Sequence, residues 1–218
     1  MSEPLVRTMS GQLAVRIRER ILTGEYAPGS QLLQDSIAAE FAVSKIPVRE
    51  ALVQLRSEGL VDVYAHRGFQ VRPVSVEEMR EVFRLRLAIE PAAVGAGALA
   101  ATAEDKATCK VALAALDEAM AAAAVRDSGD LNSAFHLSLI VPRVQPVAGE
   151  ILYRLHTLAQ RYVRMHLLPS GRMRRASKEH DALYNAWAAG KAKEAERLVR
   201  SHIEEIGADL AKALAARR

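Results

Sequence analysis

Apolar residues near the start of the chain recur with the spacing of short amphipathic helices. The first periodic segment, residues 13–22, ends before Gly24, and the turn-forming run 26–30 follows it. A second short helix is predicted at about 35–41, and a third begins after Ser44. Because only two residues separate the second helix from Ser44, the spacing is typical of a helix-turn-helix.

The third predicted helix has marked ends, an apolar face and a cationic edge. Ser44 is expected to cap it by accepting a hydrogen bond from a free backbone N–H, Pro47 falls in its first turn, and Gly59 suits its end. Lys45 and Arg49 lie one turn apart on one edge. The apolar face comprises Val48, Ala51, Leu52 and Leu55. This pattern alone fits a DNA recognition helix and also an ordinary amphipathic helix with solvated charges.

A β-hairpin is predicted directly after this helix. The strand-like runs 60–64 and 69–71 are joined by the segment 65–68. A hairpin behind a recognition helix is a wing, and His66 and Arg67 at its tip could reach phosphates or the minor groove. The preceding helix and the wing together favour DNA recognition.

Residues 10–73 resemble the winged helix-turn-helix of GntR-family bacterial transcription regulators. The matching positions are Gly24, Pro28, Gly29, Val43, Ser44, Pro47 to Leu52, Leu55, Glu58 to Leu60, Arg67 and Gly68. The resemblance implies DNA contacts from both the recognition helix and the wing. The implied contact residues are Ser44, Lys45, Arg49, His66, Arg67 and Gly68.

Three positions depart from the pattern of that family. Lys45 stands where an arginine is usual, so a point charge replaces the bidentate reading of a guanine. Ile46 replaces a small hydroxyl residue, which makes an apolar contact to a thymine methyl possible and adds Ile46 to the DNA-contacting residues. Asp35 is assigned no DNA contact.

After a boundary at 72–74, the chain is predicted to be helix after helix. Ser75 and Glu78 form an expected capping box, in which Ser75 caps the backbone and Glu78 reaches back. The predicted helices cover 75–100, 104–125, 128–140, 148–168, 174–189 and 191–214. The fold class is therefore mainly α: a winged helix-turn-helix domain at 1–73, then an all-α six-helix bundle at 74–218 with a central pocket.

Histidines are the chemical signal in the predicted bundle. Asn132 and His136 share one helical face, one turn apart. His180 and His202 lie on the last two helices, which a turn at Gly190 folds back on each other. Three imidazoles and an amide oxygen could thus converge on a divalent ion such as Zn or Ni. The alternative is a set of hydrogen-bonded histidines in a metal-free pocket.

Residues 75–218 resemble the FCD ligand-binding domain of one GntR branch. The matching residues are Arg86 to Glu90, Asn132 to His136, Glu179, His180, Ala186, Gly190, Ala195 and His202. The resemblance implies a metal held by an aspartate and three histidines, often completed by a carboxylate effector. Here Asn132 stands at the aspartate position, so it brings no negative charge and binds more weakly.

Arg86 is the main candidate for binding the effector. It can serve as a charge for an anionic ligand, or it can snorkel or pair with Glu90 one turn away. Tyr162 and His166, on one face of the fourth bundle helix, are further candidates for the pocket wall.

Composition adds limits rather than a function. The net charge of the 218 residues is +4, but residues 1–74 carry nine Lys/Arg against eight Asp/Glu, so the DNA prediction depends on where the cations lie. The single cysteine, Cys109, excludes an intrachain disulfide. The N-terminus lacks the apolar stretch of a signal peptide, and no segment is predicted to span a bilayer, so a cytoplasmic protein without membrane contact is expected.

The combined prediction is a metabolite-responsive transcription regulator, acting as a repressor and as a homodimer on a near-palindromic double-stranded operator. A small carboxylate metabolite would bind in the helical domain, through a divalent metal or without one.

Two other classes of protein stay open. A metal-dependent hydrolase could use the same histidines, although the sequence has no His-Glu-x-x-His motif and Glu179 is the only nearby candidate base. The second open class is a non-specific architectural DNA-binding protein.

Overall fold

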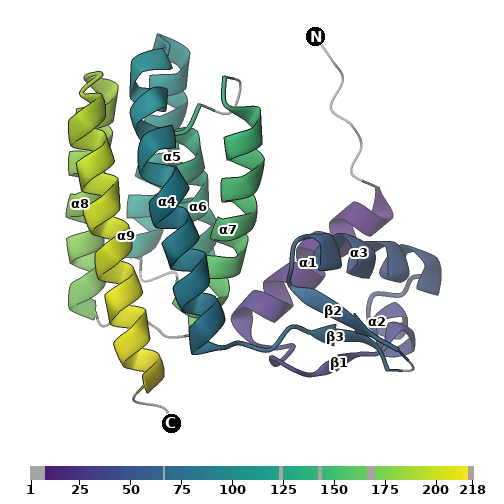
Figure 1. Cartoon of the computed structure of the whole chain (residues 1–218). Coiled ribbons are helices and arrows are strands. Elements are labelled where there is room, and N and C mark those ends of the chain that lie inside the picture. The colour runs from purple at the N-terminus through teal and green to yellow at the C-terminus, as the bar shows by residue number, and fades with distance from the viewer. Residues whose placement is uncertain (1–7, 66, 123–124, 142–143, 166–169, 216–218) are drawn as a thin grey trace. The chain divides into compact units, whose positions relative to one another are not determined.

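The computed structural model describes residues 8–65, 67–122, 125–141, 144–165 and 170–215 (Figure 1). The chain divides into two compact units, Met1–Val74 and Ser75–Arg218. Helices dominate both units, and the small sheet belongs to the first. The fold class is therefore the one that the sequence predicts: mainly α, with a winged helix-turn-helix before a helical bundle.

The first unit combines a short helical core with a three-stranded antiparallel sheet. Its elements are α1 (Met9–Thr23), β1 (Gln31–Leu32), α2 (Gln34–Glu40), α3 (Lys45–Ser57), β2 (Val61–Tyr64) and β3 (Gly68–Val71). The strand order is β1-β3-β2, so the hairpin of β2 and β3 forms the wing and β1 extends it. The inward faces of α1 and α3 are fully buried, as their periodicity predicts.

The structure confirms the predicted end of α3 but not the predicted hydrogen bond at its N-cap. Gly59 has a φ of 80°, the left-handed conformation that glycine tolerates at a helix end. Ser44 occupies the N-cap position with extended backbone angles, but its side chain makes no capping hydrogen bond. The predicted cap by the Ser44 hydroxyl is therefore wrong, and this exposed hydroxyl is available to other partners.

The second unit is a bundle whose helices cover most of its length. They are α4 (Val76–Ala100), α5 (Ala103–Ala121), α6 (Val125–Ser138), α7 (Pro146–Met165), α8 (Ser170–Ala188) and α9 (Ala192–Ala215). Helix α4 packs against α7, α8 and α9, whereas α6 packs against α5 and α7 (Figure 1). Among the described residues, no helix combines the length and apolar character needed to cross a membrane.

The start of α4 differs from the predicted capping box. The Ser75 hydroxyl accepts a hydrogen bond from the backbone N–H of Glu78, as expected. The carboxylate of Glu78, however, accepts hydrogen bonds from the Tyr162 hydroxyl and from Arg161, both on α7. This carboxylate therefore ties the first turn of α4 to α7.

A close approach near the end of α4 fixes how α6 and α8 meet it. Gly97 lies so near the end of α6 that a Cβ there would overlap the carbonyl oxygen of Leu139. The same oxygen accepts a 2.8 Å hydrogen bond from the indole N–H of the fully buried Trp187 on α8. Three helices thus meet where only a glycine leaves enough space.

We expect Gly97→Ala to destabilise the bundle by about 1–3 kcal/mol, because the added methyl group overpacks this junction. Thermal unfolding followed by circular dichroism measures the change. Ala96→Gly, at an exposed neighbouring position, reports the effect of helix propensity alone, about 0.5–1 kcal/mol in favour of alanine. A rise in melting temperature for Gly97→Ala would show that the junction has room for a methyl group.

Candidate metal centre and nucleic-acid interface

The N-terminal end of α3 presents an exposed polar surface. Ser44, Lys45 and Arg49 are all exposed, and 71% of Ile46 is accessible to solvent. The ammonium group of Lys45 lies 2.5 Å from a carboxylate oxygen of Asp35 on α2. This ion pair is largely exposed, so it costs little to exchange for a phosphate.

The wing brings a second set of predicted residues near this surface. Arg67 and Gly68 are exposed, and the backbone carbonyl of Arg67 accepts a 2.7 Å hydrogen bond from the Gln31 side chain on β1. Lys45, Arg67 and Gly68 line one groove, so the helix end and the wing share a surface. His66, also predicted at the wing tip, lies outside the described residues.

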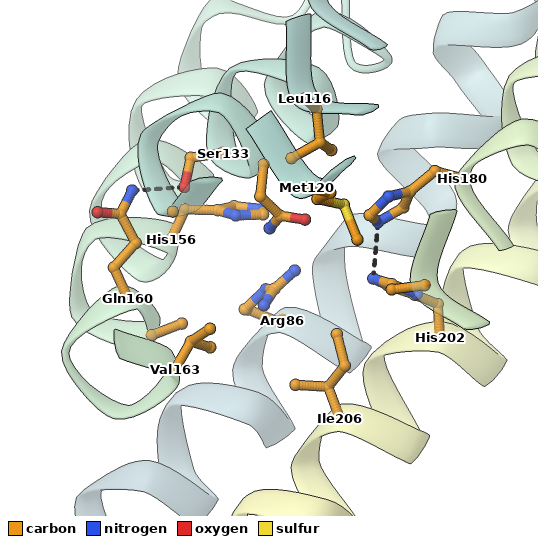
Figure 2. Close-up of a pocket in the computed structure, with 14 residues that line it drawn as sticks. Arg86, Leu116, Met120, Ser133, His156, Gln160, Val163, His180, His202 and Ile206 are labelled. Atoms are coloured by element: carbon orange, nitrogen blue, oxygen red, sulfur yellow. Dashed lines mark hydrogen bonds between the residues drawn. The ribbon is translucent and has the colours of Figure 1, made fainter. Parts of the chain in front are cut away.

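The helical unit contains a cavity of about 80 Å³, which has room for roughly five water molecules. In Figure 2, His180 and His202 lie on one side of Arg86, and Ser133, His156 and Gln160 lie on the other. The lining residues are Arg86, Leu116, Met120, Gly129, Asn132, Ser133, His156, Ala159, Gln160, Val163, Ala176, His180, His202 and Ile206. Polar groups are thus concentrated within a partly apolar wall, which is typical of small-molecule sites.

Glu90 is the most densely paired side chain beside this cavity. Its fully buried carboxylate accepts hydrogen bonds from Nε and Nη2 of Arg86, at 2.9 and 3.3 Å. Nδ1 of His136 lies 3.0 Å from one of its oxygens. Nε2 of His156 lies 3.2 Å from the other oxygen but makes no hydrogen bond to it. Burial alone would raise the pKa of Glu90, but Arg86 and the two histidines hold it well below its usual value.

Three histidines from three helices form a cluster next to Glu90. They are His136 on α6, His180 on α8 and His202 on α9, and all three are buried. Nε2 of His180 lies 3.2 Å from Nε2 of His202, and the rings of His136 and His202 stack at 5.1 Å. Nδ1 of His202 lies 2.7 Å from a carboxylate oxygen of Glu179. In the described part of the chain, no hydrogen-bond partner reaches the buried Nε2 of His136.

This cluster fits a divalent metal ion. One nitrogen from each of His136, His180 and His202 lies within 4.8 Å of the others. Two nitrogens that bind one Zn ion tetrahedrally are about 3.3 Å apart, close to the observed separation of the His180 and His202 Nε2 atoms. The solitary Nε2 of His136 would gain the partner that a buried polar atom needs.

A second group, Glu90, His136 and His156, also brings three potential ligand atoms together. It suits a cation less well, because the guanidinium of Arg86 already neutralises the Glu90 carboxylate. A metal ion there would lie beside a buried positive charge, which is unfavourable in a low-dielectric interior. The first group is therefore the better candidate metal centre.

The structure brings some of the predicted site residues of this unit together and places others elsewhere. His136, His180 and His202 come together, and Asn132, one turn before His136, lines the cavity with His180 and His202. Arg86 lines the cavity and also forms the ion pair with Glu90 that the sequence left as its alternative role. Tyr162 is buried with its hydroxyl on Glu78 and is not among the described lining residues, and His166 lies outside the described residues.

The sequence did not predict that His156 lines the cavity, nor that Glu90 contacts His136 and Glu179 contacts His202. The available signal for His156 was its spacing, because it lies one turn after the buried Leu152 and one turn before the buried Gln160 on α7. The sequence indicated that Glu90 could pair with Arg86 one turn away, but it gave no signal for the contacts of Glu90 with His136 and of Glu179 with His202, because these join different helices.

Burial sets the protonation of the histidines. Desolvation lowers the pKa of His136 and that of His202 to about 4, although Glu90 and Glu179 respectively oppose the shift, and it also lowers the pKa of His156. At neutral pH the imidazoles of His136, His156 and His202 are therefore uncharged, and a neutral imidazole is the form that can bind a metal ion.

We expect the metal-free protein to lose stability as the pH falls from 6.5 towards 4. In this window the unfolded chain takes up protons at histidine while the folded protein does not, because the folded pKa values of His136 and His202 are about 4. The loss is on the order of 3 kcal/mol per histidine at the acid end. Chelator-treated protein melted at pH 7.5, 6 and 5 tests this, and His202→Gln should reduce the pH dependence. A melting temperature that stays constant over this range would contradict the prediction.

Comparison with known proteins identifies the family. Residues 9–71 match the family model described as bacterial regulatory proteins of the gntR family, and residues 81–205 match the FCD domain. The chain is 32% identical over 209 residues to BphR, an uncharacterized HTH-type transcriptional regulator of Paraburkholderia xenovorans, covering 91% of this chain and 84% of that protein.

Solved structures agree with this result. A putative transcriptional regulator GntR from Rhodococcus sp. RHA1 has a TM-score of 0.80 at 25% identity, covering 96% of this chain and 99% of that one. E. coli McbR/YncC shares the fold, with a TM-score of 0.82 at 21% identity, covering 95% of this chain and 99% of that one. The chain belongs to the GntR family, in its FCD branch, and is a DNA-binding transcription regulator rather than an enzyme.

Proposed function

We propose that this regulator binds its operator under the control of a small organic acid, which enters the helical unit beside a histidine-bound divalent metal. The observation that carries the proposal is the buried group His136, His180 and His202, of which His180 and His202 line a cavity together with Arg86. In this proposal, residues 1–73 form the DNA-binding domain and residues 74–218 the effector-binding and dimerisation domain.

Operator recognition is assigned to the exposed end of α3 and to the wing. Arg49 would contact a base edge or a phosphate, Lys45 would exchange Asp35 for a phosphate, and Ile46 would meet a thymine methyl. The free Ser44 hydroxyl supports a further DNA contact, because it is not used in capping α3. From the wing, His66, Arg67 and Gly68 are the proposed contacts.

The effector site is assigned to the cavity. Its size of about 80 Å³ suits a molecule of only a few non-hydrogen atoms. His136, His180 and His202 would hold the metal, with Asn132 as a weak neutral ligand, and the metal would supply a Lewis-acidic position for a carboxylate. Zn or Ni fits an imidazole-rich site. Arg86 is the proposed second contact of the acid, whereas Tyr162 has no support at the cavity.

Control of DNA binding requires two states that the acid binds unequally. We assign these states to a cytoplasmic homodimer, because two recognition helices related by a twofold axis read a near-palindromic operator. A coupling of about 1–3 kcal/mol between acid and operator is typical of such systems. We propose that the protein represses transcription when it is bound to the operator, and that binding of the acid favours its release from the DNA.

Replacing Arg49 with alanine should weaken binding to the promoter beside the protein's own gene by about 10-fold to 100-fold, because one good base contact is worth about 1–3 kcal/mol. Fluorescence anisotropy measures this binding. The variant should keep the thermal stabilisation that small carboxylic acids give the wild type, since the cavity lies in the other unit. Arg56→Ala, near the other end of α3, is the control. Loss of both responses would contradict separate roles for the two units, and equal binding to unrelated duplexes would favour an architectural protein.

Purified wild-type protein should contain about one divalent ion per chain, and His202→Ala should remove it, because two imidazoles and an amide bind too weakly. Elemental analysis and melting with and without a chelator measure this. His156→Gln distinguishes the two possible ligand groups, since His156 belongs only to the second of them. If the ion is lost with His156→Gln but kept with His202→Ala, the metal lies instead at Glu90, His136 and His156.

A further inference from the structure

Two of the three clustered histidines have a glutamate at the same ring position. Nδ1 of His136 lies 3.0 Å from Oε1 of Glu90, and Nδ1 of His202 lies 2.7 Å from Oε2 of Glu179. Glu90 comes from α4 and Glu179 from α8, so neither is on the helix of the histidine that it contacts. The same arrangement is therefore built twice from unrelated segments.

The contact determines which nitrogen carries the proton. A carboxylate accepts hydrogen bonds only, so the ring nitrogen beside it must be the N–H donor. A neutral imidazole protonated at Nδ1 has its lone pair at Nε2. In His202, Nε2 faces His180, and in His136 it is the buried atom that no described residue partners. Glu179 thus directs the lone pair of His202 toward His180, and Glu90 leaves the lone pair of His136 on a buried atom that a metal ion could partner.

We propose that Glu90 and Glu179 are positioning residues for the metal centre: each holds one histidine in the tautomer and orientation that ligation needs. The inference rests on the proposed metal binding at His136, His180 and His202. Such outer partners fix the ring and raise its basicity, and losing one typically weakens metal binding by about 10- to 100-fold. Neither glutamate is assigned as a ligand.

The two glutamates differ in how deeply they are buried and in how much the fold relies on their charge. Glu179 contacts His202 from a side chain that is 23% exposed, so its charge is partly solvated. Glu90 is completely buried and also neutralises Arg86. Removing the charge of Glu90 leaves a buried guanidinium uncompensated, which is strongly destabilising, whereas Glu179 can be changed with less cost to the fold.

The decisive test is the series Glu179→Gln and Glu179→Ala in the full-length protein. Gln keeps a hydrogen-bond acceptor but loses the charge, and Ala removes both. We expect Zn affinity, measured by competition with a chromophoric chelator, to fall about 10-fold or more with Gln and further with Ala. The absorption spectrum of the Co²⁺-substituted protein should change as well. Asp181→Asn removes an exposed carboxylate from the same helix and should match the wild type.

The outcomes separate this inference from the metal proposal itself. If the wild type binds no Zn or Co²⁺, the metal proposal fails and the inference fails with it. If the wild type binds metal and both Glu179 variants bind it equally well, with an unchanged Co²⁺ spectrum, only the positioning role is overturned.

Glu90 is tested by Glu90→Gln, with Glu81→Gln at an exposed position of α4 as the control. Circular dichroism checks the fold before Zn affinity is measured. If the single variant does not fold, Arg86→Met combined with Glu90→Gln replaces it, because the pair then leaves no buried charge. A folded variant should bind Zn about 10- to 100-fold more weakly, and wild-type affinity would exclude Glu90 from the positioning role.

Discussion

The helical unit depends on one buried negative charge, the carboxylate of Glu90. An ionised group can be buried only when nearby charges and hydrogen bonds replace the water that it loses. Arg86 on α4 and His136 on α6 supply that replacement, and His156 on α7 lies 3.2 Å from the same carboxylate. Three helices must therefore meet at one point with matched rotation about their axes, and the cavity is formed beside that meeting point.

Helix α4 connects this charge to the rest of the molecule. It carries Arg86 and Glu90 on its buried face, reaches α6 and α8 closely at Gly97, and is held to α7 through Glu78 at its first turn. Only residues 72–75 separate its start from the last strand of the wing. Under the proposed function, a ligand that moved Arg86 or Glu90 would act on a helix that is joined almost directly to the DNA-binding unit, and this helix would be a short covalent path for regulation.

Most of the fold follows from local patterns in the sequence, because helix periodicity and end signals are properties of neighbouring residues. The convergence of His180 and His202 was also predictable, since the turn at Gly190 makes their two helices antiparallel. The hydrogen-bond partners of individual side chains, in contrast, were not predictable from the sequence. Ser44 does not cap α3, and Glu179 reaches His202 on the next helix, because such contacts depend on how each helix is rotated in the bundle.

The proposed anionic effector has to be reconciled with the charges around the cavity, because Arg86 already has a partner. Arg86 and Glu90 cancel each other, the buried imidazoles are neutral, and Asn132 contributes no charge. Among the described residues of the cluster, Glu179, which is partly solvated, would then be the carboxylate left to balance a divalent ion at the histidines. The remaining positive charge would belong to the metal rather than to the arginine. In the proposed arrangement Arg86 would orient the acid, the electrostatic attraction would come from the metal ion at the histidine cluster, and Glu90 would hold the geometry of that cluster.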